Sequence, residues 1–526
     1  MLLQANTTSL INIADLQLIA PELILTVCAC VALVMEVILP YRKSKLTAYF
    51  ALGGVALAFA SVAVQLWVMG SSLPAQGFYG MVRIDGAALF FKGIFLIAAG
   101  LAIGISTRYL DIEGEQHGEY YSLVLFATVG MMFLACGYDL ISLYISLELM
   151  ALTFYVLVAF TKRERKSNEA AMKYFLLGAF SSGVLLYGMS LLYGVAGSTN
   201  LGDIGSRINE LMPQIQAAIQ NNSQEGVTEN ALASLRPILL LAMIALGAGL
   251  FFKVAAVPFH MWAPDVYEGA PTSVTAFLST GSKAASFALY ARIFNDALEG
   301  MRADWAPLLG LVAAITIMVG NWAAVTQENS KRLLAYSSIS NAGYLLLALV
   351  AHNLYGFIGL GVYLFVYTLM NMGAFGVIIS LRRRGIIGDN VDDLTGLGQK
   401  APLMAAMMSI FMLSLGGLPV TGGFIGKYFL FGGLIQRGTA DGKNWYYVLA
   451  VWAIVNTVVS FYYYFRFIKV MYLGDRLADN KPLALSPALQ TVLAISVIGV
   501  LVVGVYPQPI VKLARELMRV SFGALF

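Results

Sequence analysis

The sequence predicts an all-α polytopic membrane protein with about 14 transmembrane helices, and two observations support this fold class. First, 59% of the 526 residues are hydrophobic and only 12% are charged, whereas soluble domains carry about 25% charged residues. Second, the apolar residues form continuous runs of about 20 residues, the length that an α-helix needs to cross a bilayer. Strands of a membrane β-barrel alternate in polarity and cross in about 10 residues, so these runs exclude a barrel.

The apolar runs follow one another along the whole chain, and most are separated by short polar links that favour antiparallel packing of neighbours. The longest polar segment, residues 195–235, is expected to be a solvated loop with a short helix at about 204–219. The expected spans are about 17–40, 46–69, 86–107, 120–137, 139–160, 169–194, 236–256, 271–294, 304–325, 333–351, 354–381, 401–436, 445–472 and 484–506.

The seventh and twelfth runs are broken by proline. Pro258 follows Lys253 in the seventh run, whereas Pro419 and paired glycines precede Lys427 in the twelfth. Proline removes an intrahelical hydrogen bond, and broken helices in corresponding positions indicate inverted repeats around a transport site. We therefore expect helices 1–3 in residues 1–119, one repeat of helices 4–8 in 120–295, a second of helices 9–13 in 304–473, and helix 14 with a tail in 484–526.

The basic residues indicate the orientation of the chain. If the N-terminus lies outside, the cytoplasmic side collects 16 lysines and arginines and the outer side collects ten. Short basic loops stay in the cytoplasm. We therefore expect a multi-pass protein of a bacterial inner (plasma) membrane with both termini on the outer (periplasmic) side.

Four ionisable residues, Glu148, Lys253, Lys283 and Lys427, lie deep in apolar runs. A charge at the bilayer centre costs about 2.5–3.5 kcal/mol, and these residues lie too far from helix ends to reach the interface. A structural ion pair is the alternative for Glu148, and extension to the interface is the alternative for the lysines. Because burial disfavours the charged form of an amine, a buried lysine can gain and lose a proton near neutral pH. A nearby glutamate favours the charged form, so this set of residues suits proton transfer.

Other ionisable residues in the runs are weaker candidates. Lys173 can form a surface ion pair with Glu169 four residues earlier, and His260, beside the break, can be a simple hydrogen-bonding group. We keep Lys173 and His260 as secondary relay candidates. Glu22 and Lys92 are interpreted as helix-end residues.

The sequence shows no pattern for a bound cofactor or metal. Cys28, Cys30 and Cys136 cannot easily supply four ligands for a metal or iron–sulfur cluster, and we interpret them as inert buried thiols. Phosphate-binding glycine loops and paired-histidine haem sites are also missing from the sequence.

Four segments resemble the antiporter-like subunits of respiratory complex I, the proton-pumping NADH–quinone oxidoreductase. They are FKVAAVPFHMWAPDVYEGAPTSVTAFLSTGSKAASF, SLYISLELMALTFYVLVAF, EAAMKYFLLGAFSSGVLLYG and LPVTGGFIGKYFLF, and the helix plan extends the resemblance over nearly the whole chain. The chain is most similar to the subunit N (subunit 2) branch of this family. It ends about 20 residues after helix 14, without the long lateral helix of subunit L, and it has Lys427 where subunit M carries glutamate.

The resemblance implies a role for each candidate residue. Glu148 corresponds to the helix-5 glutamate that tunes the pump lysine, Lys253, while Lys283 is the connecting lysine and Lys427 the lysine of the exit half-channel. Lys173 matches a family lysine of lesser weight. NADH, FMN, the iron–sulfur clusters and quinone belong to other subunits, so we expect no cofactor in this chain. Expected partners are the M-type and small K-type membrane subunits and the lipid bilayer, with no nucleic acid.

Two other functions remain open at this point. One is a subunit of a multisubunit cation/proton antiporter, or of a relative linked to ferredoxin or hydrogenase modules. The other is a stand-alone solute symporter, which predicts a central pocket richer in polar groups than a row of lysines.

Overall fold

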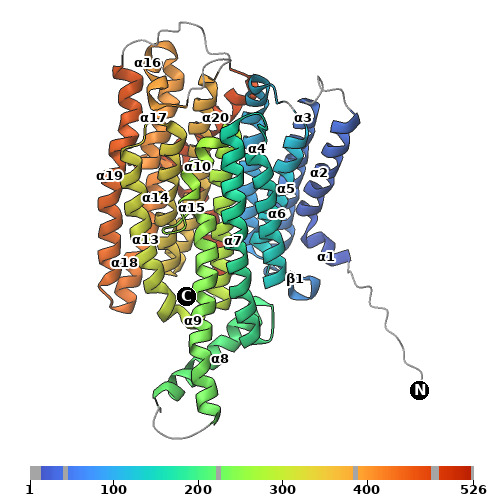
Figure 1. The fold of residues 1–526 in the computed structure, drawn as a ribbon, viewed down its shortest axis with the longest axis vertical. Coiled ribbons are helices and arrows are strands. Elements are labelled where there is room, and N and C mark those ends of the chain that lie inside the picture. The colour runs from blue at the N-terminus through green and yellow to red at the C-terminus, as the bar shows by residue number, and fades with distance from the viewer. Residues whose placement is uncertain are drawn as a thin grey trace, which may run out of the picture.

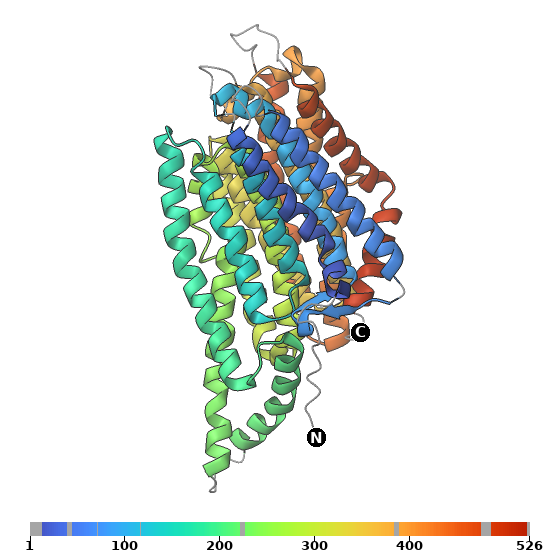
Figure 2. The same cartoon turned by 90° about the vertical axis from the view of Figure 1, so that its right-hand side faces the viewer.

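The computed structural model describes residues 13–38, 45–70, 72–115, 117–220, 227–382, 389–474 and 485–522. Almost all of them lie in helices that run along the long axis of one bundle (Figures 1 and 2). Helix α8 lies at the lower end of Figure 1 and α16 at the upper end, while α1 lies at the lower end of α2. The predicted all-α membrane fold is confirmed.

The first half of the chain runs from α1 to α10, the short helix that follows the first proline break. Its helices are α1 Ile13–Leu18, α2 Ala20–Ile38, α3 Lys45–Met69, α4 Gly86–Glu113, α5 Glu119–Cys136, α6 Leu140–Val158, α7 Arg165–Ala196, α8 Leu201–Gln220, α9 Val227–Val254 and α10 Trp262–Gly269. A small antiparallel hairpin, β1 Ala75–Gly77 and β2 Val82–Ile84, joins α3 to α4 through the 3₁₀ turn η2 Phe78–Gly80.

The second half continues with helices interrupted by short 3₁₀ and π turns. They are α11 Thr272–Phe277, η3 Leu278–Ser282, α12 Lys283–Arg292, η4 Ile293–Ala297, η5 Glu299–Met301, α13 Arg302–Val325, α14 Ser330–Ala351, α15 Leu354–Leu381, η6 Val391–Leu394, α16 Leu397–Lys400, α17 Pro402–Gly416, α18 Gly422–Asp441, α19 Trp445–Leu473, α20 Pro487–Val505 and α21 Gln508–Phe522.

Twelve helices in the described residues are long and apolar enough to cross a membrane. The two other expected spans, 271–294 and 401–436, are helical but divided, the first by the π turns η3 and η4 and the second by the break between α17 and α18. The number of crossings and the two inverted repeats stay predictions. The fourteenth run was expected to begin at residue 484, which lies outside the described residues, and α20 begins at Pro487.

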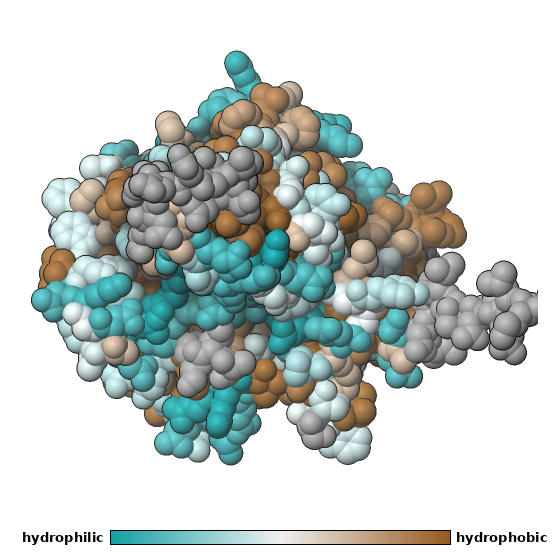
Figure 3. Space-filling view, turned by 90° about the horizontal axis from the view of Figure 1, so that it is seen from below, coloured by the Kyte–Doolittle hydropathy of each residue, from teal (hydrophilic) through white to brown (hydrophobic). Residues whose placement is uncertain are grey.

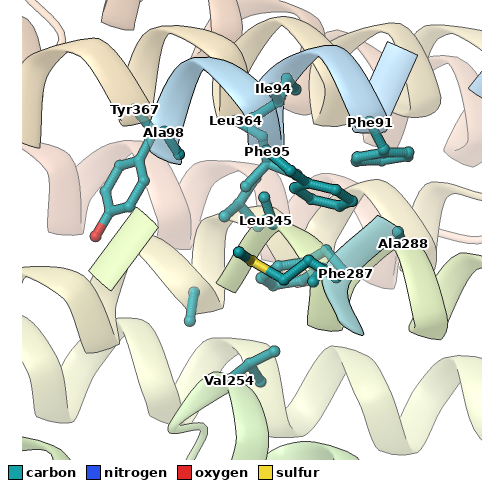
Figure 4. Packing of buried hydrophobic residues seen from close by; sticks show 14 of the residues in the cluster. Phe91, Ile94, Phe95, Ala98, Val254, Phe287, Ala288, Leu345, Leu364 and Tyr367 are labelled. Carbon is teal, nitrogen blue, oxygen red and sulfur yellow. The ribbon is translucent and has the colours of Figure 1, made fainter. Parts of the chain in front are cut away.

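The bundle has buried central helices and half-exposed outer helices. In α14 and α15, 94% of the apolar stretch is buried, against 28% in α3. A helix that is apolar almost all round, as α15 is, is expected in such a centre, whereas α14 also buries polar residues there. Phe91, Phe95 and Phe287 pack in this core (Figure 4). Seen from below, the end of the molecule shows hydrophilic residues across its centre and hydrophobic residues toward its edges (Figure 3).

The described residues of the 195–235 segment are more helical than a solvated loop. The short helix expected at 204–219 is α8, Leu201–Gln220, but α9 already begins at Val227. Helix α8 is amphipathic despite its polar composition, because Ile204, Ile208 and Ile215 recur at helical spacing and are fully buried. The cysteine interpretation was wrong for Cys30, which is exposed on α2, whereas Cys136 is buried.

Both proline breaks contain residues with left-handed backbone conformations. In the first break, between Val254 and Trp262, Ala255 has φ 59°, and in the second, between Gly416 and Gly422, Val420 has φ 73°. Such conformations are rare for residues other than glycine, above all for a β-branched residue. Local strain of this kind persists only where the surrounding structure imposes it, and it concentrates at functional sites.

Candidate functional site

Three buried lysines lie where helices are irregular. Lys253 is the penultimate residue of α9, Lys283 follows the π turn η3, and Lys427 lies in the second turn of α18. Their exposed fractions are 5%, 3% and 3%. Within a bilayer, breaks in a helix are tolerated where protein groups or a water-filled cavity form hydrogen bonds with the freed backbone groups. Each of the three lysines thus places an amine beside irregular backbone.

Lys253 has no hydrogen-bond partner among the described residues. Its Nζ lies 5.9 Å from the centre of the Phe252 ring, and its electrostatic partner is Glu148 of α6. Glu148 is half-buried and its Oε1 is buried without a hydrogen bond. The two side chains therefore interact through charge without forming a closed ion pair in the described structure, which leaves both free to respond to a change in separation.

An aromatic cluster from α7 and α10 packs on Phe252, the residue before Lys253. Tyr174 stacks on Trp262 with ring centres 4.6 Å apart, and Trp262 packs against Phe252 at 5.4 Å. The indole Nε1 of Trp262 donates to the carbonyl oxygen of Phe252 at 2.9 Å. The first break is thus closed by an indole rather than by the neighbouring lysine.

Lys283 is anchored across the bundle to α14. Its Nζ donates to the carbonyl oxygen of Ser338 and to Ser338 Oγ, the latter at 2.5 Å. The hydroxyl of Tyr267, from α10, lies 3.2 Å from the same Ser338 Oγ. Hydroxyl groups both donate and accept, so Ser338 connects the lysine with further polar groups.

Lys427 is held by the second break itself. Its Nζ donates to the carbonyl oxygens of Leu415 at 3.1 Å and Gly416 at 3.3 Å, and it lies 4.6 Å from the centre of the Tyr344 ring. Leu415 precedes Pro419 by four residues, and proline lacks the N–H that would pair with this carbonyl. The lysine takes the place of that missing donor.

Lys173 and His260 lie in less enclosed positions. The Lys173 side chain is 44% exposed and forms ion pairs with Glu169 at 3.0 Å and Asp265 at 2.9 Å. Asp265 also pairs with Arg332 of α14 at 2.9 Å, so the ion pairs tie α7, α10 and α14 together. His260 is partly buried within the break, and its Nδ1 is buried without a hydrogen bond.

Sequence reasoning missed two buried ion pairs. Glu22 and Lys92 are both completely buried and form a pair at 2.6 Å, so neither is a helix-end residue reaching for water. Arg292 pairs in the same way with Asp85, its Nη1 lying 2.6 Å from Oδ2. Lys92 could have been suspected, because it stands in the apolar run ALFFKGIF, but no local signal identifies partners 70 or 207 residues away in the sequence.

Comparison with known proteins gives consistent relatives. Residues 137–455 match the family model described as "NADH:quinone oxidoreductase/Mrp antiporter, TM". The chain is 47% identical to NADH-quinone oxidoreductase subunit N 2 of Solibacter usitatus, over 96% of this chain and 97% of that protein. It is 45% identical to NADH-quinone oxidoreductase subunit N 1 of Koribacter versatilis, over 98% of both chains.

Solved structures with the same fold include chains of respiratory complex I and of an Mrp complex. A chain of respiratory complex I from Thermus thermophilus matches with a TM-score of 0.75 and 32% identity, over 94% of this chain and 99% of that one. A chain of the Mrp complex from Dietzia sp. matches with a TM-score of 0.80 but 19% identity, over 97% of this chain and 98% of that one. The second likeness shows the fold alone.

Proposed function

The chain belongs to the subunit N branch of the NADH–quinone oxidoreductase/Mrp antiporter family, and from this premise we propose how its buried residues move protons. It is a proton-translocating membrane subunit of an NADH–quinone oxidoreductase, in which electron transfer takes place in partner subunits. The relatives named subunit N favour this function over a cation/proton antiporter, since the likeness to the Mrp complex concerns the fold only.

The observation that supports a proton path best is the placement of three lysines, each at most 5% exposed, at three irregular points of the helices. Lys253 takes up and releases the proton, and Glu148 tunes it through charge. Lys283 passes the proton across the centre, and Lys427 delivers it at the second break. Lys173 and His260 are secondary relay groups. Lys173 is paired with Asp265 of α10, and His260 lies within the first break.

The arrangement of the subunit follows from the same proposal. Residues 120–295 and 304–473 form two inverted repeats, each with one broken helix, and both termini lie on the periplasmic side of the bacterial inner membrane. The positions of Lys166 and Arg332 at the ends of α7 and α14 suit the short basic loops of the cytoplasmic side. Neighbouring membrane subunits of M-type and K-type flank the chain, and FMN, iron–sulfur clusters and quinone are held by partner subunits.

The test is proton pumping by the intact complex with this chain altered. Lys253→Ala and Glu148→Ala should each lower NADH-driven proton translocation and coupled turnover, while the complex still assembles. Lys512→Ala is the matched control, because that side chain is 78% exposed on α21. A normal ratio of protons to electrons in both variants would overturn the proposal.

A further inference from the structure

A buried polar layer fills the space between Lys283 and Lys427. Polar groups inside a membrane protein are costly unless they are hydrogen-bonded, and intramembrane polar residues concentrate along ion pathways. Each of these side chains is at most 1% exposed, and they come from α13, α14, α15 and α19: Asn321, Ser337, Ser338, Asn341, Tyr344, Tyr363 and Tyr464.

The Lys283 end of this layer is α14. Ser338 accepts a hydrogen bond from Lys283. Its sequence neighbour Ser337 is hydrogen-bonded to Tyr464. Tyr367 lies close by, with its ring centre 5.9 Å from Lys283 Nζ and its hydroxyl buried without a hydrogen bond. Figure 4 shows this hydroxyl pointing away from the packed Phe91, Phe95 and Phe287 side chains.

Tyr464 of α19 stands at the middle of the layer. Its hydroxyl lies 2.5 Å from Ser337 Oγ. Asn341 Nδ2 donates to the same Ser337 Oγ at 3.4 Å, and the hydroxyl of Tyr363 donates to Asn341 Oδ1 at 2.6 Å. The Tyr464 hydroxyl is therefore bound to the residue next to the Lys283 anchor.

The ring of Tyr464 lies beside the helix end that holds the other lysine. It lies against Gly416, where an added Cβ would be 3.5 Å from the Tyr464 ring. The carbonyl oxygen of Gly416 accepts a hydrogen bond from Lys427 Nζ. Tyr464 thus bridges from Ser337, the neighbour of the Ser338 that binds Lys283, to the helix end that binds Lys427.

We propose that the Tyr464 hydroxyl is a proton-relay group between Lys283 and Lys427. The Lys283 ammonium gives a proton to Ser338. Rotation of the Ser338 and Ser337 hydroxyls, or a bridging water, then transfers a proton to Tyr464. The phenol oxygen of Tyr464 accepts this proton while its own hydrogen leaves toward the Lys427 amine, so tyrosine and serines end neutral and one positive charge has moved from lysine to lysine. This relay rests on the proton path proposed above.

A purely structural bond that joins α14 to α19 is the competing explanation. Both explanations expect Tyr464→Phe to lose one hydrogen bond, but only the relay requires the hydroxyl for transport. Phenylalanine keeps the ring against Gly416, and Ser337→Ala removes the same bond from the other side. Tyr290→Phe is a matched control, because the Tyr290 hydroxyl is also buried but lacks a partner among the described residues and lies in α12, away from the layer.

The experiment measures NADH-driven proton translocation by the reconstituted complex in H2O and D2O. Tyr464→Phe should assemble normally and transfer protons about tenfold more slowly, a barrier increase of about 1.4 kcal/mol. Ser337→Ala should have a similar effect, the double variant should be no worse than either, and Tyr290→Phe should behave as the parent chain.

The outcomes separate the relay from the function on which it rests. Normal pumping and an unchanged isotope effect in Tyr464→Phe, together with loss of pumping in Lys283→Ala, overturn the relay and leave the proton path standing. Normal pumping in Lys283→Ala and Lys427→Ala overturns the proton path itself. If Tyr464→Phe fails to assemble, Ser337→Ala decides, and normal pumping in that variant overturns the relay.

Discussion

The two proline breaks each contain a buried lysine and an interrupted backbone hydrogen-bond pattern, but different groups bind the carbonyls. At the first break the carbonyl oxygen of Phe252 accepts from the indole of Trp262 and from the backbone N–H of Ala255, and Lys253 is left without a hydrogen bond. At the second break Lys427 itself binds the free carbonyls of Leu415 and Gly416.

The order of lysine and proline explains this difference. Side chains on a helix tilt toward its N-terminus. Lys253 precedes its break, so its side chain leans back along α9, whereas Lys427 follows its break and leans back onto the last turn of α17. Carbonyls at a helix C-terminus favour a cation. The reversed order of lysine and proline therefore separates a lysine that interacts with one carboxylate from a lysine that is held by backbone carbonyls.

The largest expected difference is in stability. Lys427→Ala should leave two buried carbonyl oxygens without a donor, and one unsatisfied buried group costs about 1–3 kcal/mol. Lys253→Ala leaves no such group. Thermal inactivation of the purified complex should therefore occur at a clearly lower temperature for Lys427→Ala than for Lys253→Ala, and Lys427→Arg should recover part of the loss. Equal inactivation temperatures for the two alanine variants would contradict the comparison.

A smaller effect is expected in the coupling between charges. Glu148 acts on Lys253 through charge, so Glu148→Gln and Lys253→Met should be non-additive in a double-mutant cycle on pumping rate. A coupling of about tenfold corresponds to about 1.4 kcal/mol. The cycle of Glu148→Gln with Lys427→Met is the control and should be closer to additive. Equal coupling in both cycles would show that the carboxylate acts on the whole path.

The sequence predicted what depends on local chemistry. Hydropathy placed the helices, and proline placed both breaks, because each effect arises within a few neighbouring residues. Lys253, Lys283 and Lys427 were noticed because charge in an apolar run is costly. The ion pair of Glu22 and Lys92 was missed because hydropathy reports depth and not the partner across the bundle.

Other failures have a similar physical basis. Cys30 was taken as buried, but it is exposed on α2. The exposed faces of a membrane helix are as apolar as its buried faces, so composition cannot separate the two. The helix expected at 204–219 was placed correctly, whereas the start of α9 at Val227 was missed because the polar composition of residues 195–235 indicated a solvated loop. The anchor of Lys283 on Ser338 joins residues 55 positions apart, a contact that depends on how α12 packs near α14.

The smallest expected effect concerns the indole that closes the first break. Trp262→Phe removes one donor from the Phe252 carbonyl, and a single net hydrogen bond contributes about 0.5–1.5 kcal/mol. The stacking on Tyr174 can be retained by phenylalanine, so the inactivation temperature should fall slightly and pumping should persist. Thr316→Val is the matched variant, because the Thr316 hydroxyl accepts from the backbone N–H of Val257 at 3.0 Å in the same break. A loss from Trp262→Phe as large as that from Lys427→Ala would mean that the first break depends on its closing donor as strongly as the second, and that the two breaks are built alike.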